Sequence, residues 1–246
     1  MKRVGIIGCG AIGSLIAAAF ENGTIKCDEL ILFDYNMEKS LKLQQSLSIV
    51  CRVVNDVEGM VQRHPAIIVE AASQQAAKEY IGRILRENIE LVVMSTGALL
   101  ELDIEKGRVH VPSGAVGGLD AISSAALAGI HEVVLTTRKN PRVLGVERKQ
   151  RETVYQGTAE EAVKLFPREM NVAATLALTV RPVKVNVEVV ADPDVRRNTH
   201  EISVKWKYGD MFLRFENEPH PMNPGTSALA AWSAIRLLQD LLERKG

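Results

Sequence analysis

The chain has 246 residues, 46% of them hydrophobic, and its 30 basic side chains are balanced by 30 acidic ones. This length and apolar content suit one large or two modest globular domains with a buried core. The balanced charge, without a long basic or acidic run, argues against nucleic acid or a membrane surface as a partner.

The first predicted elements are a strand, a glycine turn and a helix. Apolar residues 4–7 lead into Gly8-Cys9-Gly10-Ala11-Ile12-Gly13, and small and apolar side chains follow to Phe20. In a dinucleotide-binding turn the first glycine permits the bend, the second lets a pyrophosphate approach the backbone, and the third lets the helix lie close to the strand. We therefore expect Gly8, Gly10 and Gly13, with the helix N-terminus at Ala11 and Ile12, to bind a dinucleotide. A purely structural glycine turn is the alternative.

A second apolar run, Leu30–Phe33, predicts a strand that ends at Asp34. This acid follows the last glycine by about twenty residues, where a dinucleotide ribose needs a hydrogen-bond acceptor. Its carboxylate accepts from the 2′-hydroxyl of NAD and repels the 2′-phosphate of NADP. NAD is the expected cofactor, and NADP is the alternative because Tyr35 and Asn36 are uncharged.

Three further apolar runs, at 52–54, 66–69 and 91–94, predict strands with helices between them. Continuous apolar runs are typical of strands buried on both faces, so the pattern predicts an α/β fold with a doubly wound parallel sheet of the Rossmann type. Ligands of such sheets bind beyond the carboxyl ends of the strands. We expect the loops there, Ala71-Ala72-Ser73 and Thr96-Gly97, to contact the cofactor, although plain turns with a helix cap explain them nearly as well.

After residue 108 the pattern changes and a second domain is expected. A glycine-rich segment, Ser113–Gly118, opens an alanine-rich helix to Leu127 and forms either a second anion cradle or a hinge. The remaining elements are predicted as strands at 132–137 and 183–190, a helix at 171–180, and a hairpin of 201–208 with 211–215 that turns at Gly209-Asp210. They predict a second α/β domain with an open mixed sheet.

Residues 226–244 carry an apolar helical stripe, which predicts that this helix packs back on the first domain. We therefore expect residues 1–108 and 224–246 to form the dinucleotide-binding domain and residues 109–223 to form the catalytic domain. The three cysteines form no CxxC pair, which favours buried thiols in a reducing compartment. A strand beginning almost at Met1 leaves no room for a signal peptide, and no apolar run reaches the ~18 residues of a membrane span. We expect a cytoplasmic protein.

His200 is the candidate proton carrier, because it lies in a predicted polar turn that leads into the hairpin. Hydride transfer at a carbon bearing nitrogen or oxygen needs a group that gives and takes a proton near neutral pH, and imidazole does both. An ordinary strand-end histidine is the alternative. No pair of His, Cys or carboxylate side chains has the spacing of metal ligands, so no metal is predicted. The absence of a GxSxG elbow and of a P-loop argues against hydrolysis and phosphoryl transfer.

Five segments together resemble the L-aspartate dehydrogenase family, over nearly the whole chain. They are GCGAIG at 8–13, VPSGAVGGLDA at 111–121, FPREMNVAATLAL at 166–178, RRNTHEI at 196–202 and NPGTSALAAWSAI at 223–235. The resemblance implies NAD- or NADP-dependent oxidative deamination of L-aspartate to iminoaspartate. That product hydrolyses to oxaloacetate and ammonia or supplies NAD biosynthesis. A homodimer, with the second domain also serving dimerisation, is implied as well.

The resemblance also implies residue roles. His200 matches the family's catalytic acid/base, and Ala115 and Asn171 match residues that contact the nicotinamide nucleotide. The two substrate carboxylates need donors, for which the candidates are Ser113, the amides of Gly117 and Gly118, Asn198, and a cation among Lys139, Arg196 and Arg197. The tripeptide Arg168-Glu169-Met170 departs from the family pattern by its charge.

Two other functions stay open at this point. A relative of dihydrodipicolinate reductase or homoserine dehydrogenase would share the two-domain plan, but the His-rich signature of the former and a lysine-bearing catalytic motif of the latter are not evident. A non-catalytic NAD-binding sensor would bind nucleotide without turnover.

Overall fold

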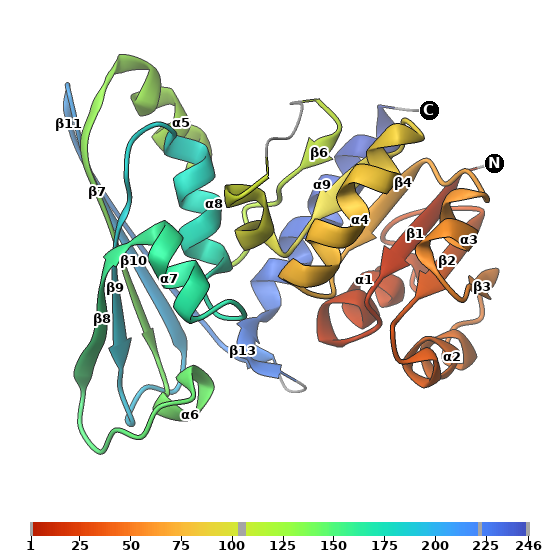
Figure 1. Cartoon of the computed structure of the whole chain (residues 1–246), viewed down its shortest axis with the longest axis horizontal. Coiled ribbons are helices and arrows are strands. Elements are labelled where there is room, and N and C mark those ends of the chain that lie inside the picture. Colours follow the sequence, from red (N-terminus) through yellow and green to blue (C-terminus); the bar gives the residue numbers. More distant parts are fainter. Residues whose placement is uncertain (1, 103–106, 221–222, 245–246) are drawn as a thin grey trace. The chain divides into compact units, whose positions relative to one another are not determined.

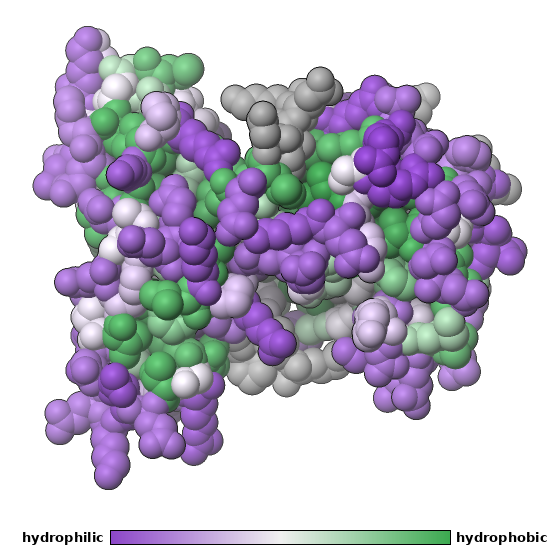
Figure 2. Space-filling model, in the orientation of Figure 1, coloured by the Kyte–Doolittle hydropathy of each residue, from purple (hydrophilic) through white to green (hydrophobic). Residues whose placement is uncertain are grey.

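The computed structural model describes residues 2–102, 107–220 and 223–244 and divides into two compact units (Figure 1). Unit 1 comprises Met1–Pro112 and Ala231–Gly246, and unit 2 comprises Ser113–Ala230. These boundaries lie a little further along the chain than the predicted ones at 108 and 223. Figure 2 shows hydrophilic residues over much of the surface of each unit, with apolar patches between them.

Unit 1 is built on a six-stranded sheet in the order β3-β2-β1-β4-β5-β6, and every neighbouring pair of strands is parallel. Its strands are β1 (Arg3–Ile7), β2 (Glu29–Phe33), β3 (Cys51–Val53), β4 (Ile67–Glu70), β5 (Glu90–Val93) and β6 (Val109–His110). Its helices are α1 (Ala11–Glu21), α2 (Met37–Gln45), α3 (Val57–Val61), α4 (Gln74–Arg86) and the short 3₁₀ helix η1 (Thr96–Leu100). The predicted doubly wound parallel sheet is confirmed. The apolar pattern missed only β6, which is two residues long.

The C-terminal helix α9 (Ala228–Glu243) joins the core of unit 1. Its buried side chains pack with those of α1 against one face of the sheet; they are Ala234, Ile235, Leu238, Leu241 and Leu242. Two hydrogen bonds add to this packing, from Lys2 Nζ to the Leu242 carbonyl (3.1 Å) and from Gln239 Nε2 to the Thr24 carbonyl (2.8 Å). The apolar stripe predicted from the sequence is therefore the face of α9 that packs in the core of unit 1.

Unit 2 contains a five-stranded sheet in the order β11-β10-β7-β9-β8, in which β7 and β9 are parallel and the other pairs antiparallel. The predicted open mixed sheet is confirmed. Its strands are β7 (Ile130–Lys139), β8 (Glu152–Thr158), β9 (Asn186–Ala191), β10 (Asn198–Trp206) and β11 (Gly209–Asn217). The helices are α5 (Leu119–Ala128), α6 (Pro141–Leu144), α7 (Ala159–Leu165) and α8 (Asn171–Val180), and a small ribbon pairs β12 (Pro219–His220) with β13 (Asn223–Ser227).

The two faces of this sheet differ. Figure 1 shows α5, α7 and α8 along one face, and no helix of the described residues along the other. Along β7 the buried residues alternate with partly exposed ones, so Thr137 and Lys139 belong to the helix-covered face and Arg138 to the open face. The strand period of two therefore decides which side chains enter the interior of unit 2.

The hairpin of β10 and β11 is present, but its turn was predicted at the wrong residues. Trp206 pairs with Gly209, so Lys207 and Tyr208 form the turn, whereas Gly209 and Asp210 belong to β11. The Tyr208 ring packs edge-on against Trp206 with centroids 5.4 Å apart, and the Lys207 ammonium lies 5.1 Å from the centre of the Tyr208 ring. These contacts stabilise the turn at Lys207 and Tyr208, which the preference of glycine for hairpin turns does not predict.

None of the helices in the described part of the chain combines the length and the apolar character that crossing a membrane requires. All three cysteines are free. Burial raises the pKa of Cys9 and of Cys27 to about 12 and that of Cys51 to about 11. These thiols are therefore protonated near neutral pH, and they pack in or against the core of unit 1.

Candidate active site

The glycine turn of unit 1 connects β1 to α1, and its three glycines differ in what a side chain would meet at each position. Gly8 has a φ of +96°, and a Cβ there would lie 2.7 Å from the Ala71 carbonyl oxygen. A Cβ on Gly13 would overlap the Gly8 carbonyl oxygen, whereas a Cβ on Gly10 would meet no atom within 4 Å. The backbone at Gly10 is thus open to an approaching group, as a pyrophosphate-binding turn requires.

The N-terminus of α1 lies next to this opening. No side chain of the described residues caps it, and its first turn holds no acidic residue. Ala11 and Ile12, the first two helical residues, are partly exposed. The positive end of the helix dipole is therefore left for an external anion, which fits the phosphates of a dinucleotide.

Asp34 follows β2 and is held by the backbone. Its Oδ2 accepts a hydrogen bond from the Cys9 amide (2.7 Å), and its Oδ1 accepts one from the Asn36 amide (2.9 Å). The carboxylate lines a cavity of about 230 Å³ in unit 1. Of the predicted cofactor residues the cavity gathers Gly8, Gly10, Asp34, Ala71, Ala72 and Ser73, and its other lining residues are Ile7, Phe33, Tyr35, Lys39, Ala76 and Tyr80.

Lys39 is a lining residue that the sequence analysis missed. It lies in the first turn of α2, five residues after Asp34, and it adds a cation to the lining of the cavity that Asp34 also lines. The predicted contacts Thr96 and Gly97 lie elsewhere: both are buried in η1, outside the lining of this cavity. Their role toward a cofactor stays a prediction.

Glu70, the last residue of β4, begins the first of the two predicted loops, and its side chain, for which no role was predicted, connects both loops. Its buried carboxylate accepts hydrogen bonds from the amides of Ala72 (2.8 Å) and Ser73 (3.0 Å). It also accepts from the Ser95 amide (3.1 Å) and the Ser95 hydroxyl (2.9 Å). Burial raises the pKa of Glu70, against the opposite effect of these four donors. Glu70 therefore fixes the loops that follow β4 and β5.

In unit 2, His200 lies within β10 and only 2% of its surface is exposed. The sequence analysis placed it in a polar turn, and the structure corrects this: the strand alternation turns its side chain to the helix-covered face. Nδ1 lies 3.1 Å from the Thr137 hydroxyl on β7. Burial, and secondly the charge of Lys139, lowers the pKa of His200 to about 3. The imidazole is therefore neutral near pH 7, and in the protein without substrate it is a weak base.

The low pKa predicts how stability depends on pH. Between pH 6.5 and about 3 the unfolded chain protonates His200 and the folded chain does not, so this group makes unfolding easier as the pH falls. We expect its contribution to the free energy of unfolding to decrease by ~1.4 kcal/mol per pH unit over this range. Urea unfolding of the wild type and of His200→Gln from pH 7 to pH 5 tests this. The wild type should lose more stability than the variant, and equal losses would contradict the prediction.

Lys139 ends β7 on the same face as His200, and its side chain is 3% exposed. Its Nζ lies 2.6 Å from Glu169 Oε2 and donates to the Glu169 carbonyl oxygen at 3.4 Å. Burial lowers the pKa of Lys139, and the charge of Glu169 partly restores it. Of the three cations considered for the substrate, Lys139 is therefore the one on the His200 face.

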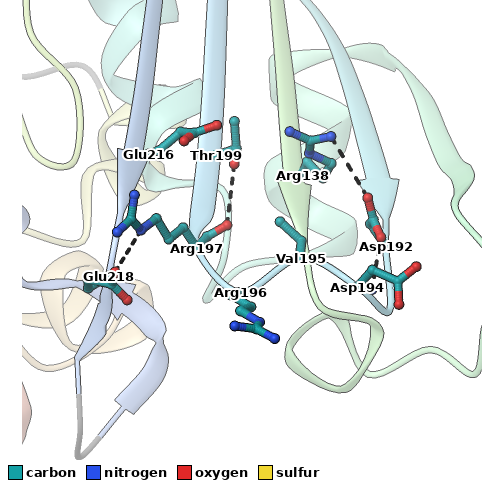
Figure 3. A pocket seen from close by; sticks show the side chains of 9 residues that line it. All are labelled: Arg138, Asp192, Asp194, Val195, Arg196, Arg197, Thr199, Glu216 and Glu218. Atoms are coloured by element: carbon teal, nitrogen blue, oxygen red, sulfur yellow. Dashed lines mark hydrogen bonds and ion pairs between the residues drawn. The ribbon is translucent and has the colours of Figure 1, made fainter.

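The other two cations, Arg196 and Arg197, line a different cavity of about 640 Å³ in unit 2 (Figure 3). There Arg197 Nε forms an ion pair with Glu218 Oε1 at 2.6 Å. Arg138 Nη1 lies 3.8 Å from Asp192 Oδ2. Arg138 precedes Lys139 and points to the opposite face of the sheet. The cavity with Arg196 and Arg197 is thus separate from the His200 face.

The glycine-rich segment 113–118 lies against β11. Asn217 Nδ2 donates to the Ala115 carbonyl (2.9 Å), and the position of a Cβ on Gly117 would be 3.6 Å from the Phe215 ring. Phe215 pairs with His200, and Asn217 pairs with the buried Asn198. Ala115 and Gly117 therefore belong to the same face of the sheet as His200 and Asn198.

Two further predicted residues are Ser113 and Asn171, which lie close in sequence to residues already described. Ser113 is partly exposed and is the first residue of the glycine-rich segment. Asn171 begins α8 immediately after the turn that carries Glu169. Among the described residues no three His, Cys, Asp or Glu side chains are grouped to hold a metal ion.

Comparison with known proteins covers both units. A family model described as "Aspartate dehydrogenase, C-terminal" matches residues 120–241, and one described as "Homoserine dehydrogenase, NAD binding domain" matches residues 8–107. The L-aspartate dehydrogenase of Methanothermobacter thermautotrophicus is 39% identical over 99% of this chain and 97% of its own. That of Archaeoglobus fulgidus is 40% identical over 98% of both chains. The crystal structure of aspartate dehydrogenase from Thermotoga maritima matches with a TM-score of 0.77 and 31% identity, over 98% of this chain and 97% of the other.

Proposed function

The chain belongs to the L-aspartate dehydrogenase family, and we propose that it catalyses the NAD(P)-dependent oxidative deamination of L-aspartate. The product is iminoaspartate, which water converts to oxaloacetate and ammonia. The observation that carries the proposal is the neutral, buried imidazole of His200 on the same sheet face as the Lys139 ammonium. One group can take a proton and the other can bind a carboxylate, as this reaction requires.

The cofactor and His200 have different roles in this reaction. A nicotinamide dinucleotide held by Gly8, Gly10 and Asp34 would supply the acceptor for the hydride from Cα of aspartate. The C=N bond forms as the amine nitrogen loses a proton, and His200 accepts that proton. Because Thr137 adjoins Nδ1, Nε2 is the nitrogen that faces the substrate. The substrate brings two carboxylates, whose negative charge raises the pKa of His200 and makes it a stronger base. After His200 releases that proton to solvent, the same nitrogen is free to take a proton from the water that attacks the imine.

Substrate binding is assigned to the residues around this face. Lys139 pairs with one substrate carboxylate, and Asn198, Ser113 and the amide of Gly117 donate to the remaining oxygens. Ala115 and Asn171 contact the nicotinamide nucleotide. Support comes from the placement of Ala115, Gly117 and Asn198 on the His200 face and from the family to which the chain belongs.

Unit 1 is proposed to bind the dinucleotide and unit 2 to carry catalysis and dimerisation in a cytoplasmic homodimer. The open face of the unit 2 sheet, where Phe212 of β11 is 68% exposed, is the surface we assign to the dimer interface. Light scattering coupled to gel filtration measures the mass in solution. A mass of twice the 27.0 kDa chain is expected.

The cofactor preference follows from the cavity of unit 1. NAD should bind more tightly than NADP because of the Asp34 carboxylate, while Lys39 keeps NADP binding measurable. We expect Asp34→Asn, which retains an oxygen for the Cys9 amide, to reduce the preference by roughly ten- to a hundredfold, because a hydrogen bond to a charged group contributes roughly 1.5 to 3 kcal/mol. Fluorescence titration with both cofactors measures this. Tighter binding of NADP than of NAD by the wild type would contradict the assignment.

The decisive assay for the function is the oxidation of NADH, followed by absorbance, with oxaloacetate and ammonia. Turnover that needs both, and that is lost with other oxo acids, is expected. An NAD-binding sensor would bind the nucleotide without oxidising it. A homoserine dehydrogenase relative would leave oxaloacetate and ammonia unreacted, and the match at residues 120–241 argues against it.

A further inference from the structure

The charged tripeptide before α8 contains Glu169, whose carboxylate forms a 2.6 Å ion pair with Lys139. The ammonium is almost fully buried, while the Glu169 side chain is 15% exposed. A buried cation without an anionic partner is strongly destabilising, so Lys139 needs a carboxylate whether or not substrate is bound. Glu169 supplies it in the free protein.

The Glu169 carboxylate lies where another carboxylate can replace it as the partner of Lys139. It belongs to a short turn between α7 and α8, in which the amides of Glu169 and Met170 donate to the Phe166 carbonyl at 3.0 and 3.2 Å. Lys139, by contrast, is the last residue of a central strand. A shift of the turn would release the carboxylate to solvent without disturbing the sheet. Replacing one carboxylate by another leaves the charge around Lys139 unchanged.

We propose that Glu169 occupies the place of a substrate carboxylate on Lys139 and is displaced when the dicarboxylate binds. This inference rests on the proposed function, because it takes Lys139 as the substrate-binding cation. Lys139 is then paired with a carboxylate both in the free protein and in the complex. Because Glu169 competes with the substrate for Lys139, it weakens substrate binding. Since Glu169 is two residues from Asn171, its displacement also moves the chain next to the proposed nicotinamide contact.

Calorimetric titration with succinate, a four-carbon dicarboxylate that cannot react, tests the competition in the NAD-saturated protein. If Glu169 occupies Lys139 in about nine of ten molecules, Glu169→Gln should bind succinate about tenfold more tightly. The matched control is Glu218→Gln, which breaks another 2.6 Å carboxylate pair on the Arg197 side of the sheet and should leave the affinity unchanged. Equal or weaker binding by Glu169→Gln would show that Glu169 only holds Lys139 in place, and would overturn the proposal.

A second measurement uses the wild-type protein and does not depend on a variant that folds. Hydrogen exchange of the amides of residues 168–170 should become faster when succinate is bound, because the turn loses its ion pair. Slower or unchanged exchange would overturn the proposal. Turnover of aspartate tests the proposed function separately: tighter succinate binding by Glu169→Gln in a protein that does not oxidise aspartate would support the exchange and reject the activity.

Discussion

Replacement of His200 by alanine is expected to lower the turnover of L-aspartate by on the order of 10² to 10⁴, the usual contribution of a positioned acid/base. The affinity for NAD should change little, because the glycine turn and Asp34 belong to unit 1 and His200 to unit 2. Steady-state rates of NADH formation, together with fluorescence titration of NAD, measure both quantities. Aspartate-dependent rates within a few-fold of the wild type would remove His200 from the mechanism.

A buried histidine also stabilises the fold, so the loss of activity needs a control for stability. Thr199→Ala changes the neighbouring residue of β10, which is equally buried but points to the open face of the sheet. We expect this variant to keep its turnover. The thermal melting profiles of both variants must show folded protein, because inactivity through unfolding would say nothing about proton transfer.

Truncation of the chain after Thr226 is expected to unfold unit 1. The deletion removes the apolar face of α9, and the exposure of each large side chain such as Ile235, Leu238 or Leu241 costs roughly 1.5 to 3 kcal/mol. The total is comparable to the ~5 to 15 kcal/mol by which a whole domain is stable. The truncated protein should therefore be insoluble or lack a cooperative melting transition.

The control for this truncation is a chain that ends at Glu243, the last residue of α9. It should melt close to the full-length protein and bind NAD with the same affinity. A soluble chain ending at Thr226 with unchanged melting temperature and NAD affinity would show that α9 contributes nothing to unit 1.

The sequence by itself determined the features that depend on near neighbours in the chain. The continuous apolar runs of β1, β2, β4 and β5 predicted a parallel sheet buried on both faces, and the structure has it. Helix α8 begins and ends at the predicted residues, Asn171 and Val180. The glycine turn could be recognised because backbone conformation and close packing at Gly8 and Gly13 tolerate no side chain.

The tertiary structure decided what depends on residues far apart in the chain. Strand pairing set the face on which each side chain lies, and this buried His200 and separated Lys139 from Arg196 and Arg197. The pairing of Lys139 with Glu169 and the four donors around Glu70 depend on loops that meet only in the folded chain. The period of a strand predicts alternation but not which face is covered, and that choice sets the burial and therefore the pKa of each group.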